Sequence, residues 1–462
     1  MNLMNFTGKQ YDVIRGQILS YLCQGDLWAC SLINKTWGQL AKSKLWCQPE
    51  FGNERSTSLQ AFQQFLRTLK NVGSETTSLI QVIDVSQIQE SLYETLDDNW
   101  LTIVIQNCSN LRSLIIRDVP FLTTMAIRKL ITNCKRDHIN LQYLNLEHSK
   151  NVTENLLKSF IQKFPELLAI NLNSCSGVSD SSISQISYYC QDLNTIDISN
   201  SRSRVTDVSI YAIAKFGKQK LKNLNFSSMQ KISDNSINTL ANHCKHLEVV
   251  NLSNCSQLIS SSGLENLLMA NKNSLKELWM HNMKGVPVLT QGLWELIAIR
   301  CEKLKVLSIS FNAIYHSFPF STQDKCLIYF YFSRFKSLNK LILYDIPEHA
   351  SAKFIWCLIE CCGIESDDSG ASKNDSNRIN DNLRLDLNPT DRRNVLKEVS
   401  IYRAEFESDF ILGGYAKSKT STETFGKDDE EVNEDWANKF NEQHLDGPKI
   451  KLIRLVESVD IC

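Results

Sequence analysis

The sequence predicts an α/β solenoid, in which short parallel strands form one face and helices form the other. A six-residue pattern, L-x-x-L-x-L with Ile, Val or Phe allowed, recurs through most of the 462 residues. The first apolar residues of the regular copies are 26 to 30 residues apart, and a helix-start signal follows several of the strands. Stacked units of this length bury a continuous core between neighbours, so the chain can grow without closing into a sphere.

The strand pattern is most regular between residues 111 and 309. Its copies begin at Leu111, Leu141, Leu167, Leu193, Leu221, Leu247, Leu275 and Leu304. Less regular copies are expected to begin at Ile80, Leu338, Leu396 and Ile450. Alternation along a strand turns the leucine-type side chains into the core and the side chains between them outward. The period is that of leucine-rich repeats.

The second half of several repeats carries the pattern V/I-[ST]-[DE], as in Val178-Ser179-Asp180 and Ile232-Ser233-Asp234. A Ser or Thr side chain can accept a hydrogen bond from a free N–H group at a helix start. An acidic side chain beside it is favoured by the positive end of the helix dipole. We therefore expect a helix to begin at each of these sites.

The fifteen cysteines follow the same repeat. The spacing C-x-x-L joins a helix to the next strand at Cys108, Cys190, Cys244 and Cys301, whereas Cys175 and Cys255 follow their strand where the chain turns inward. Small, weakly polar side chains suit such positions. No C-x-x-C pair occurs, and the one tight group, at 357, 361 and 362, lies beside an apolar run. Buried thiols are therefore favoured over a zinc site.

Together these features resemble the cysteine-containing subclass of leucine-rich repeats, closely over residues 105–312 and loosely over 80–462. The resemblance implies a horseshoe with parallel strands on its concave face and helices outside. This subclass is typical of F-box proteins and of a few relatives that lack an F-box.

Residues 1–50 do not fit the repeat, and Ile14, Ile18 and Leu22 are spaced as one face of a helix. The segments Ile18–Leu22, Asp26-Leu27, Ser31–Trp37 and Leu45-Trp46 resemble an F-box, the small all-α module that binds the Skp-type adaptor of cullin ligases. The usual Leu-Pro start is replaced here by Gln10 and Tyr11. The alternative is a plain helical cap, which a repeat array needs over its first apolar face.

The F-box resemblance implies an adaptor-binding surface in this module, formed by Ile14, Ile18, Leu22, Leu27, Trp37, Leu40 and Trp46. Residues 51–78 contain an amphipathic helix that we expect to connect the module to the repeats, which occupy residues 79–462. Two polar inserts, at 365–382 and 417–447, are expected to be flexible loops within the late repeats.

The strand positions that face outward are the candidate target-binding surface. Asn dominates the centre of that surface, and Asn side chains at matching positions can hydrogen-bond along the stack. Aromatic side chains gather on later strands, and exposed aromatic residues are frequent binding hot spots. The residues we assign to target binding are Tyr143, Asp197, Trp279, His281, Tyr344 and Tyr402.

Composition and motifs argue against several classes of function. The net charge of −1 gives no basic field for nucleic acid, and no stretch approaches the roughly 20 apolar residues of a membrane span. Residues 1–10 do not resemble a secretory signal. Known catalytic, phosphate-binding and dinucleotide-binding motifs do not occur. We predict no catalytic residues, no metal site and no cofactor.

The resulting expectation is a non-catalytic substrate-recognition subunit of a cullin-type (SCF) ubiquitin ligase, monomeric apart from its complex and cytoplasmic or nuclear. The module would bind the Skp-type adaptor, and through it the cullin, while the repeats bind an unknown target protein. The first alternative is a scaffold or competitive inhibitor outside any ligase, like the mitotic-exit antagonist of this repeat subclass. The second is a subunit of a DNA-damage recognition complex.

Overall fold

The computed structural model describes residues 8–51, 57–88, 95–134, 140–201, 204–217, 219–258, 260–283, 289–310, 314, 331–332, 334–345, 398–404 and 449–455. The chain forms two compact units, Met1–Lys220 (unit 1) and Leu221–Cys462 (unit 2). The two expected inserts, at 365–382 and 417–447, and the cysteines at 357, 361 and 362 lie outside the described residues.

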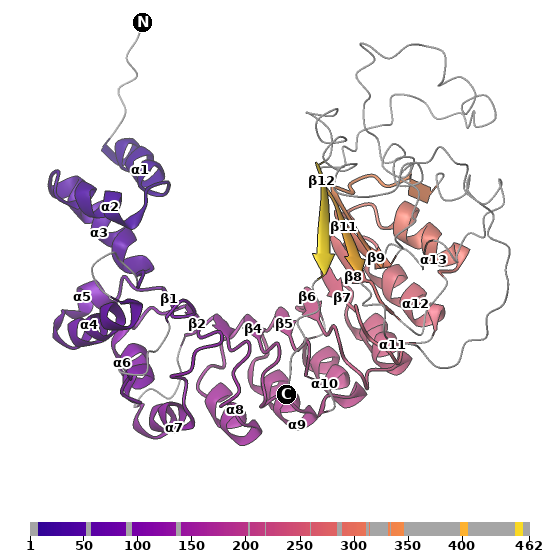
Figure 1. Cartoon of the computed structure of the whole chain (residues 1–462), viewed down its shortest axis with the longest axis horizontal. Helices are drawn as coiled ribbons and strands as arrows, with labels where there is room; N and C mark the ends of the chain where they lie inside the picture. The colour runs from indigo at the N-terminus through magenta and orange to yellow at the C-terminus, as the bar shows by residue number, and fades with distance from the viewer. Residues whose placement is uncertain are drawn as a thin grey trace, which may run out of the picture. The chain divides into compact units, whose positions relative to one another are not determined.

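Unit 1 begins with a helical module of three helices, α1 (Gly8–Leu19), α2 (Gln24–Ser31) and α3 (Lys35–Cys47) (Figure 1). Helix α3 begins at Asn34, whose side chain accepts hydrogen bonds from the N–H groups of Thr36 and Trp37, both at 3.1 Å. Such a cap satisfies donors that the helix itself cannot. The core of the module is small and is centred on Leu19, Leu27 and Ala41.

A connecting segment follows the module, with helices α4 (Ser58–Asn71) and α5 (Ser74–Thr77). Phe62 on α4 is buried, and its ring centroid lies 5.8 Å from that of Trp100 at the start of the repeats. The Gln81 N–H donates to the Cys47 carbonyl at 2.9 Å, so the module is also hydrogen-bonded to the chain just before the first strand.

The repeats of unit 1 form a parallel sheet with its strands in chain order (Figure 1). The strands are β1 (Val82–Asp84), β2 (Ser113–Ile115), β3 (Tyr143–Asn145), β4 (Ala169–Asn171) and β5 (Thr195–Asp197). The helices are α6 (Trp100–Asn107), α7 (Thr124–Asn133), α8 (Glu154–Ile161), α9 (Asp180–Tyr189) and α10 (Asp207–Gly217). These helices lie along one side of the sheet and leave the other side, the strand face, without helices.

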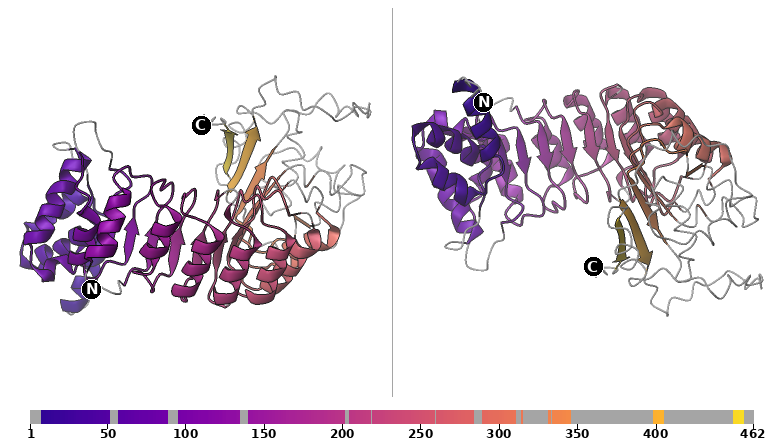
Figure 2. Two further views of the ribbon diagram at one scale, coloured as in Figure 1. Left: turned by 90° about the horizontal axis from the view of Figure 1, so that it is seen from below. Right: turned by 90° about the horizontal axis from the view of Figure 1, so that it is seen from above.

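Unit 2 has the same organisation, as the two views of Figure 2 show. Its strands are β6 (Asn223–Asn225), β7 (Val249–Asn251), β8 (Glu277–Met280), β9 (Val306–Ser310), β10 (Lys340–Tyr344), β11 (Glu398–Ala404) and β12 (Lys449–Leu455). Its helices are α11 (Asp234–His243), α12 (Ser261–Asn271), α13 (Gln291–Glu295) and the π-helix η2 (Leu296–Arg300).

The three apolar positions of the strand pattern are buried in both units. Leu144 and Leu146 in unit 1, like Leu224 and Phe226 in unit 2, are at most 1% exposed. Because every strand contributes the same positions, the core runs from repeat to repeat beneath the strands. The predicted α/β solenoid of leucine-rich repeats is confirmed.

One predicted strand register is wrong. We aligned Ile450 with the first position of the pattern, but Ile450 pairs with Val399, which holds the second position, and Leu452 pairs with Ile401. The segment carries apolar residues at 450, 452, 453 and 455, so it fits the pattern in two frames that differ by three residues. Pairing with β11 selects the other frame, in which Gly447 stands where a leucine is usual.

The V/I-[ST]-[DE] signal begins helices as predicted, and its acid also reaches the next repeat. Ser179 caps α9 by accepting a hydrogen bond from Ser182 N–H at 3.2 Å. The Asp180 carboxylate accepts hydrogen bonds from the N–H and hydroxyl groups of Thr206 and Ser209, at 2.6 to 3.2 Å. We name this contact the inter-repeat cap. Burial favours a raised pKa for Asp180, but these hydrogen bonds outweigh burial and leave its pKa lowered.

The repeat cysteines are buried thiols that bond backward along the array. Cys190 donates to the Phe164 carbonyl at 3.4 Å, and Cys255 donates to the Phe226 carbonyl at 3.3 Å. Burial raises the pKa of the Cys190 thiol to about 12 and that of Cys255 to about 11. Both therefore stay protonated at neutral pH and are poor nucleophiles. Within the described ranges, no helix is long and apolar enough to cross a membrane.

Candidate protein-binding surfaces

The helical module exposes an unusual number of large apolar side chains. Of fourteen such side chains in the described residues, eight lie between residues 11 and 33. They are Tyr11, Val13, Ile14, Ile18 and Tyr21 on and after α1, and Trp28, Leu32 and Ile33 on and after α2. Tyr21 is 89% exposed and Trp28 is 63% exposed. Concentrations of exposed apolar side chains mark protein interaction sites.

The residues that we predicted for adaptor binding divide into two groups. Ile14 and Ile18 are exposed, at 39% and 46%. Leu22, Trp37 and Leu40 pack partly buried against the module core.

Two of the predicted adaptor-binding residues face away from that surface. Leu27 is buried in the core, so it can act only by holding the exposed side chains in place. The Trp46 ring lies 6.4 Å from the Phe65 ring of α4, so it packs toward the connecting segment. Six exposed side chains were missed, and among these Trp28 was predictable because it follows the inward-facing Leu27 on a short helix.

On the strand face of unit 1, the polar residue that ends each strand binds back to its own chain. Asn145 and Asn171 accept hydrogen bonds through Oδ1 from the N–H groups of Glu147 and Asn173, each at 2.9 Å. Asp84 and Asp197 occupy the same position and accept in the same way from the N–H groups two residues on, at 2.9 Å. We expected Asn side chains to bond along the stack, but these oxygens stabilise the turn at the end of their own strand.

The turn continues one residue further with a left-handed backbone. Asp118 and His148 have φ angles of 52° and 58°, and the equivalent residues of later repeats lie between 53° and 61°. Asn, Asp and His tolerate this conformation better than most residues. The His148 N–H donates to the Asn173 carbonyl at 2.9 Å, so the turns of neighbouring repeats are tied together.

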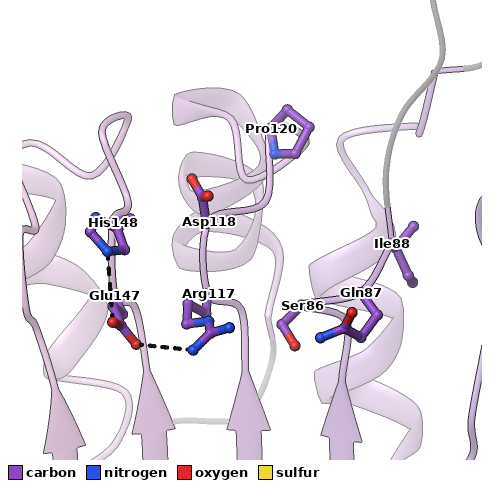
Figure 3. A pocket seen from close by; sticks show the side chains of 8 residues that line it. All are labelled: Ser86, Gln87, Ile88, Arg117, Asp118, Pro120, Glu147 and His148. Carbon is purple, nitrogen blue, oxygen red and sulfur yellow. Dashed lines mark ion pairs between the residues drawn. The ribbon is translucent and has the colours of Figure 1, made fainter. Parts of the chain in front are cut away.

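A polar pocket of about 660 Å³ lies among the first three of these turns (Figure 3). It is lined by Ser86, Gln87, Ile88, Arg117, Asp118, Pro120, Glu147 and His148. The Arg117 guanidinium lies 3.8 Å from the Glu147 carboxylate, and His148 Nε2 lies 3.7 Å from it. Both are long contacts with half-exposed partners, and ion pairs of this kind contribute little stability.

Tyr143 and Asp197, two of the predicted target-binding residues, lie on this strand face and are partly buried. Burial is the largest cause that raises the pKa of the Tyr143 phenol, and the charges of Glu147, Asp197 and Asp84 raise it further. A hydrogen bond from Asn145, at 3.4 Å, acts in the opposite direction. Tyr143 is thus an aromatic ring surrounded by carboxylates.

The strand face of unit 2 brings three more predicted residues together. The His281 ring stacks on the Tyr344 ring with centroids 3.6 Å apart and 15° between planes. His281 lies on the strand after Ser253 and two strands before Tyr344, and the small residues Ser308 and Ser310 on β9 leave room for the stack. Trp279 Nε1 donates to Glu277 at 3.2 Å. The side chain of Tyr402 lies outside the described part of the chain.

Two serine hydroxyls contact this histidine without forming a reactive pair. His281 Nδ1 lies 3.0 Å from Ser253 Oγ and 2.9 Å from Ser308 Oγ. Both serines are at most 1% exposed, so a substrate has no access to either hydroxyl. Burial lowers the pKa of His281 to about 4, so the ring is neutral at pH 7 and is a weak base. The arrangement positions side chains for binding.

The fold and these surfaces define a leucine-rich-repeat protein with an N-terminal helical module. The sequence is 27% identical over 195 residues to Antagonist of mitotic exit network protein 1 of Saccharomyces cerevisiae, covering 42% of this chain and 32% of the relative. It is 25% identical over 237 residues to the protein of the same name in Candida glabrata, covering 51% of this chain and 42% of that one. The chain thus spans about a third to two-fifths of these relatives. No family model matches the sequence.

Among solved structures, the fold is similar to a chain in the crystal structure of the Rad7 and Elc1 complex in yeast. The TM-score is 0.44 at 13% sequence identity, with 73% of this chain and 89% of that chain covered. A likeness at this level carries no argument about function.

Proposed function

We propose that this protein is a non-catalytic adaptor that recruits a target protein to a cullin-type ubiquitin ligase. The helical module binds a Skp-type adaptor, and the strand faces bind the target. The observation that supports this proposal is the set of eight exposed large apolar side chains on residues 11–33. A module that served only as a cap would bury those side chains on the first repeats.

The division of labour follows from the arrangement of the side chains. The module offers apolar side chains, which suit a stable interface with a desolvated centre. The strand faces offer polar and aromatic side chains on a rigid sheet, which suit recognition of a specific partner. The protein contributes proximity and orientation to the transfer of ubiquitin, which other subunits carry out.

The experiment is a pull-down of the purified chain with a Skp-type adaptor. We expect the full chain to bind and a chain without residues 1–50 to lose binding. Replacement of Trp28 and Leu32 by Ala should also abolish binding, because both are exposed and their loss leaves the module core intact. Met269→Ala is the matched control, since it removes a half-exposed apolar side chain from α12. Failure of the full chain to bind would contradict the proposal.

A second candidate function is antagonism of mitotic exit by competition for a protein partner. It is favoured by the two relatives whose names describe an antagonist of the mitotic exit network. The two functions predict different roles for the module. If competition alone acts, a chain without residues 1–50 should still delay mitotic exit when overproduced in budding yeast. If adaptor binding is required, that chain should be inactive.

A further inference from the structure

The strand face of unit 1 has more negative than positive charge. The outward positions of β1–β5 and their turns carry the carboxylates of Asp84, Asp118, Glu147 and Asp197, against the guanidinium groups of Arg112 and Arg117. Arg112 precedes β2, whereas the acids lie at the other end of the strands. The end of the strand face where the turns lie is therefore acidic.

Two of these carboxylates carry a charge that the fold does not require. Asp84 and Asp197 accept a hydrogen bond from the N–H group two residues on. Asn145 and Asn171 make the same hydrogen bond from the same position on β3 and β4. A neutral amide oxygen thus supports this turn as well as a carboxylate does. The negative charge of Asp84 and Asp197 remains available to a partner.

The acids are regularly spaced across the sheet. Asp84 ends β1, Glu147 follows β3 and Asp197 ends β5, so they occur on every second strand. Neighbouring strands are about 4.8 Å apart, so successive acids are roughly 10 Å apart across the sheet. An extended chain advances about 3.4 Å per residue, so about three residues span that interval. Tyr143 lies on the middle strand, with its ring among the three carboxylates.

We propose that the acidic end of the unit 1 strand face binds an extended basic segment of a target protein, with Lys or Arg at about every third residue. This inference names the target class and rests on the proposed function. Charge complementarity favours such a partner over an acidic one. The ring of Tyr143 offers a face for a cation. The pocket beside Arg117 and Glu147 provides room for one long basic side chain.

The test measures binding of a fluorescent nine-residue peptide, Lys-Ala-Ser repeated three times, to the full chain. The control peptide carries Glu in place of each Lys. We expect the lysine peptide to bind, the glutamate peptide not to bind, and affinity for the lysine peptide to fall as salt is raised. A peptide with its three lysines placed together should bind more weakly if the spacing matters.

The decisive variant is Asp84→Asn with Asp197→Asn, which removes two charges and keeps both turn hydrogen bonds. We expect it to weaken lysine-peptide binding about fivefold or more, since two charge contacts are lost. The control, Glu75→Gln with Glu166→Gln, removes two exposed charges outside the strand face and should leave binding unchanged. Tyr143→Ser should weaken binding, and Tyr143→Phe should preserve it.

Three outcomes would overturn the inference. They are no binding of the lysine peptide by the full chain, equal binding of the glutamate peptide, and equal weakening by the control variant. Adaptor pull-down of the same variants separates this inference from the proposed function, because Asp84 and Asp197 lie outside the helical module. If peptide binding depends on these acids while the adaptor does not bind, the basic-segment site stands and its role in a ligase is rejected.

Discussion

The helical module and the leucine-rich repeats treat apolar side chains in opposite ways. The module buries a core centred on Leu19, Leu27 and Ala41 and exposes eight large apolar side chains. The repeats bury their pattern positions almost completely, as Leu144 and Leu224 show. Burial of apolar area is the main source of stability, so the repeats supply the stability of the chain. The exposed side chains of the module are available to a partner.

The strongest test of this comparison is removal of a large side chain from the repeat core. Phe160 on α8 is fully buried, and its ring packs edge-on against Phe164 at 4.9 Å. Phe160→Ala should lower the free energy of unfolding by about 3–5 kcal/mol, because it removes apolar contacts and leaves a cavity. Urea unfolding followed by circular dichroism measures the change. A loss below about 1 kcal/mol would show that unit 1 does not depend on this core.

The second prediction concerns the buried histidine of unit 2. The folded pKa of His281 is about 4, below the usual 6.5. As pH falls below 6.5 the unfolded chain takes up a proton that the folded chain does not accept until about pH 4. Acid therefore favours unfolding across this window. Wild type should lose about 1–2 kcal/mol more than His281→Gln between pH 7 and pH 5. Parallel urea unfolding at both pH values tests this, and equal losses would contradict it.

A smaller effect is expected at the inter-repeat cap. Asp180→Ala removes the acceptor for Thr206 and Ser209 and should cost about 1–2 kcal/mol. Since the folded pKa of Asp180 is lowered, its contribution is present above the usual carboxyl pKa and is lost as pH falls through the folded value. The gap between wild type and variant should therefore narrow in acid. A gap that stays constant with pH would argue against an ionised cap.

The smallest stability effect should come from the module surface. Trp28 is 63% exposed, so Trp28→Ala should change the free energy of unfolding by less than about 0.5 kcal/mol. The same variant should weaken binding of the Skp-type adaptor strongly, since exposed aromatic side chains often dominate interfaces. A melting curve and a pull-down on one protein sample measure both. Large destabilisation with normal adaptor binding would reverse the comparison.

Much of the fold followed from the sequence because the repeat signal is redundant. Many copies of one pattern constrain the strands, and the cap signal at Ser179 marks a helix start independently. The register at Ile450 failed because a strand with extra apolar residues fits the pattern in two frames. Only pairing with a neighbouring strand distinguishes those frames.

The candidate surfaces were harder to predict than the fold. The sequence placed His281 and Tyr344 on outward positions, but their stacking depends on small residues of the strand between them. Leu27 and Trp46 were assigned to a surface because apolar spacing identifies a helix face without saying what covers it. The acids around Tyr143 lie on three different strands, and their proximity appears only when the strands are in register.

The inter-repeat cap also bears on how such an array changes in length during evolution. Asp180 reaches forward to Thr206 and Ser209, and Asp234 reaches forward to the Ser260 N–H in the same way. Each acid serves the helix of the following repeat, and each repeat brings both an acid and a hydroxyl residue. Loss or duplication of a whole repeat re-joins equivalent partners, whereas a cut within a repeat leaves one of them without its counterpart. Gene rearrangements that preserve the period are therefore the ones that this architecture tolerates.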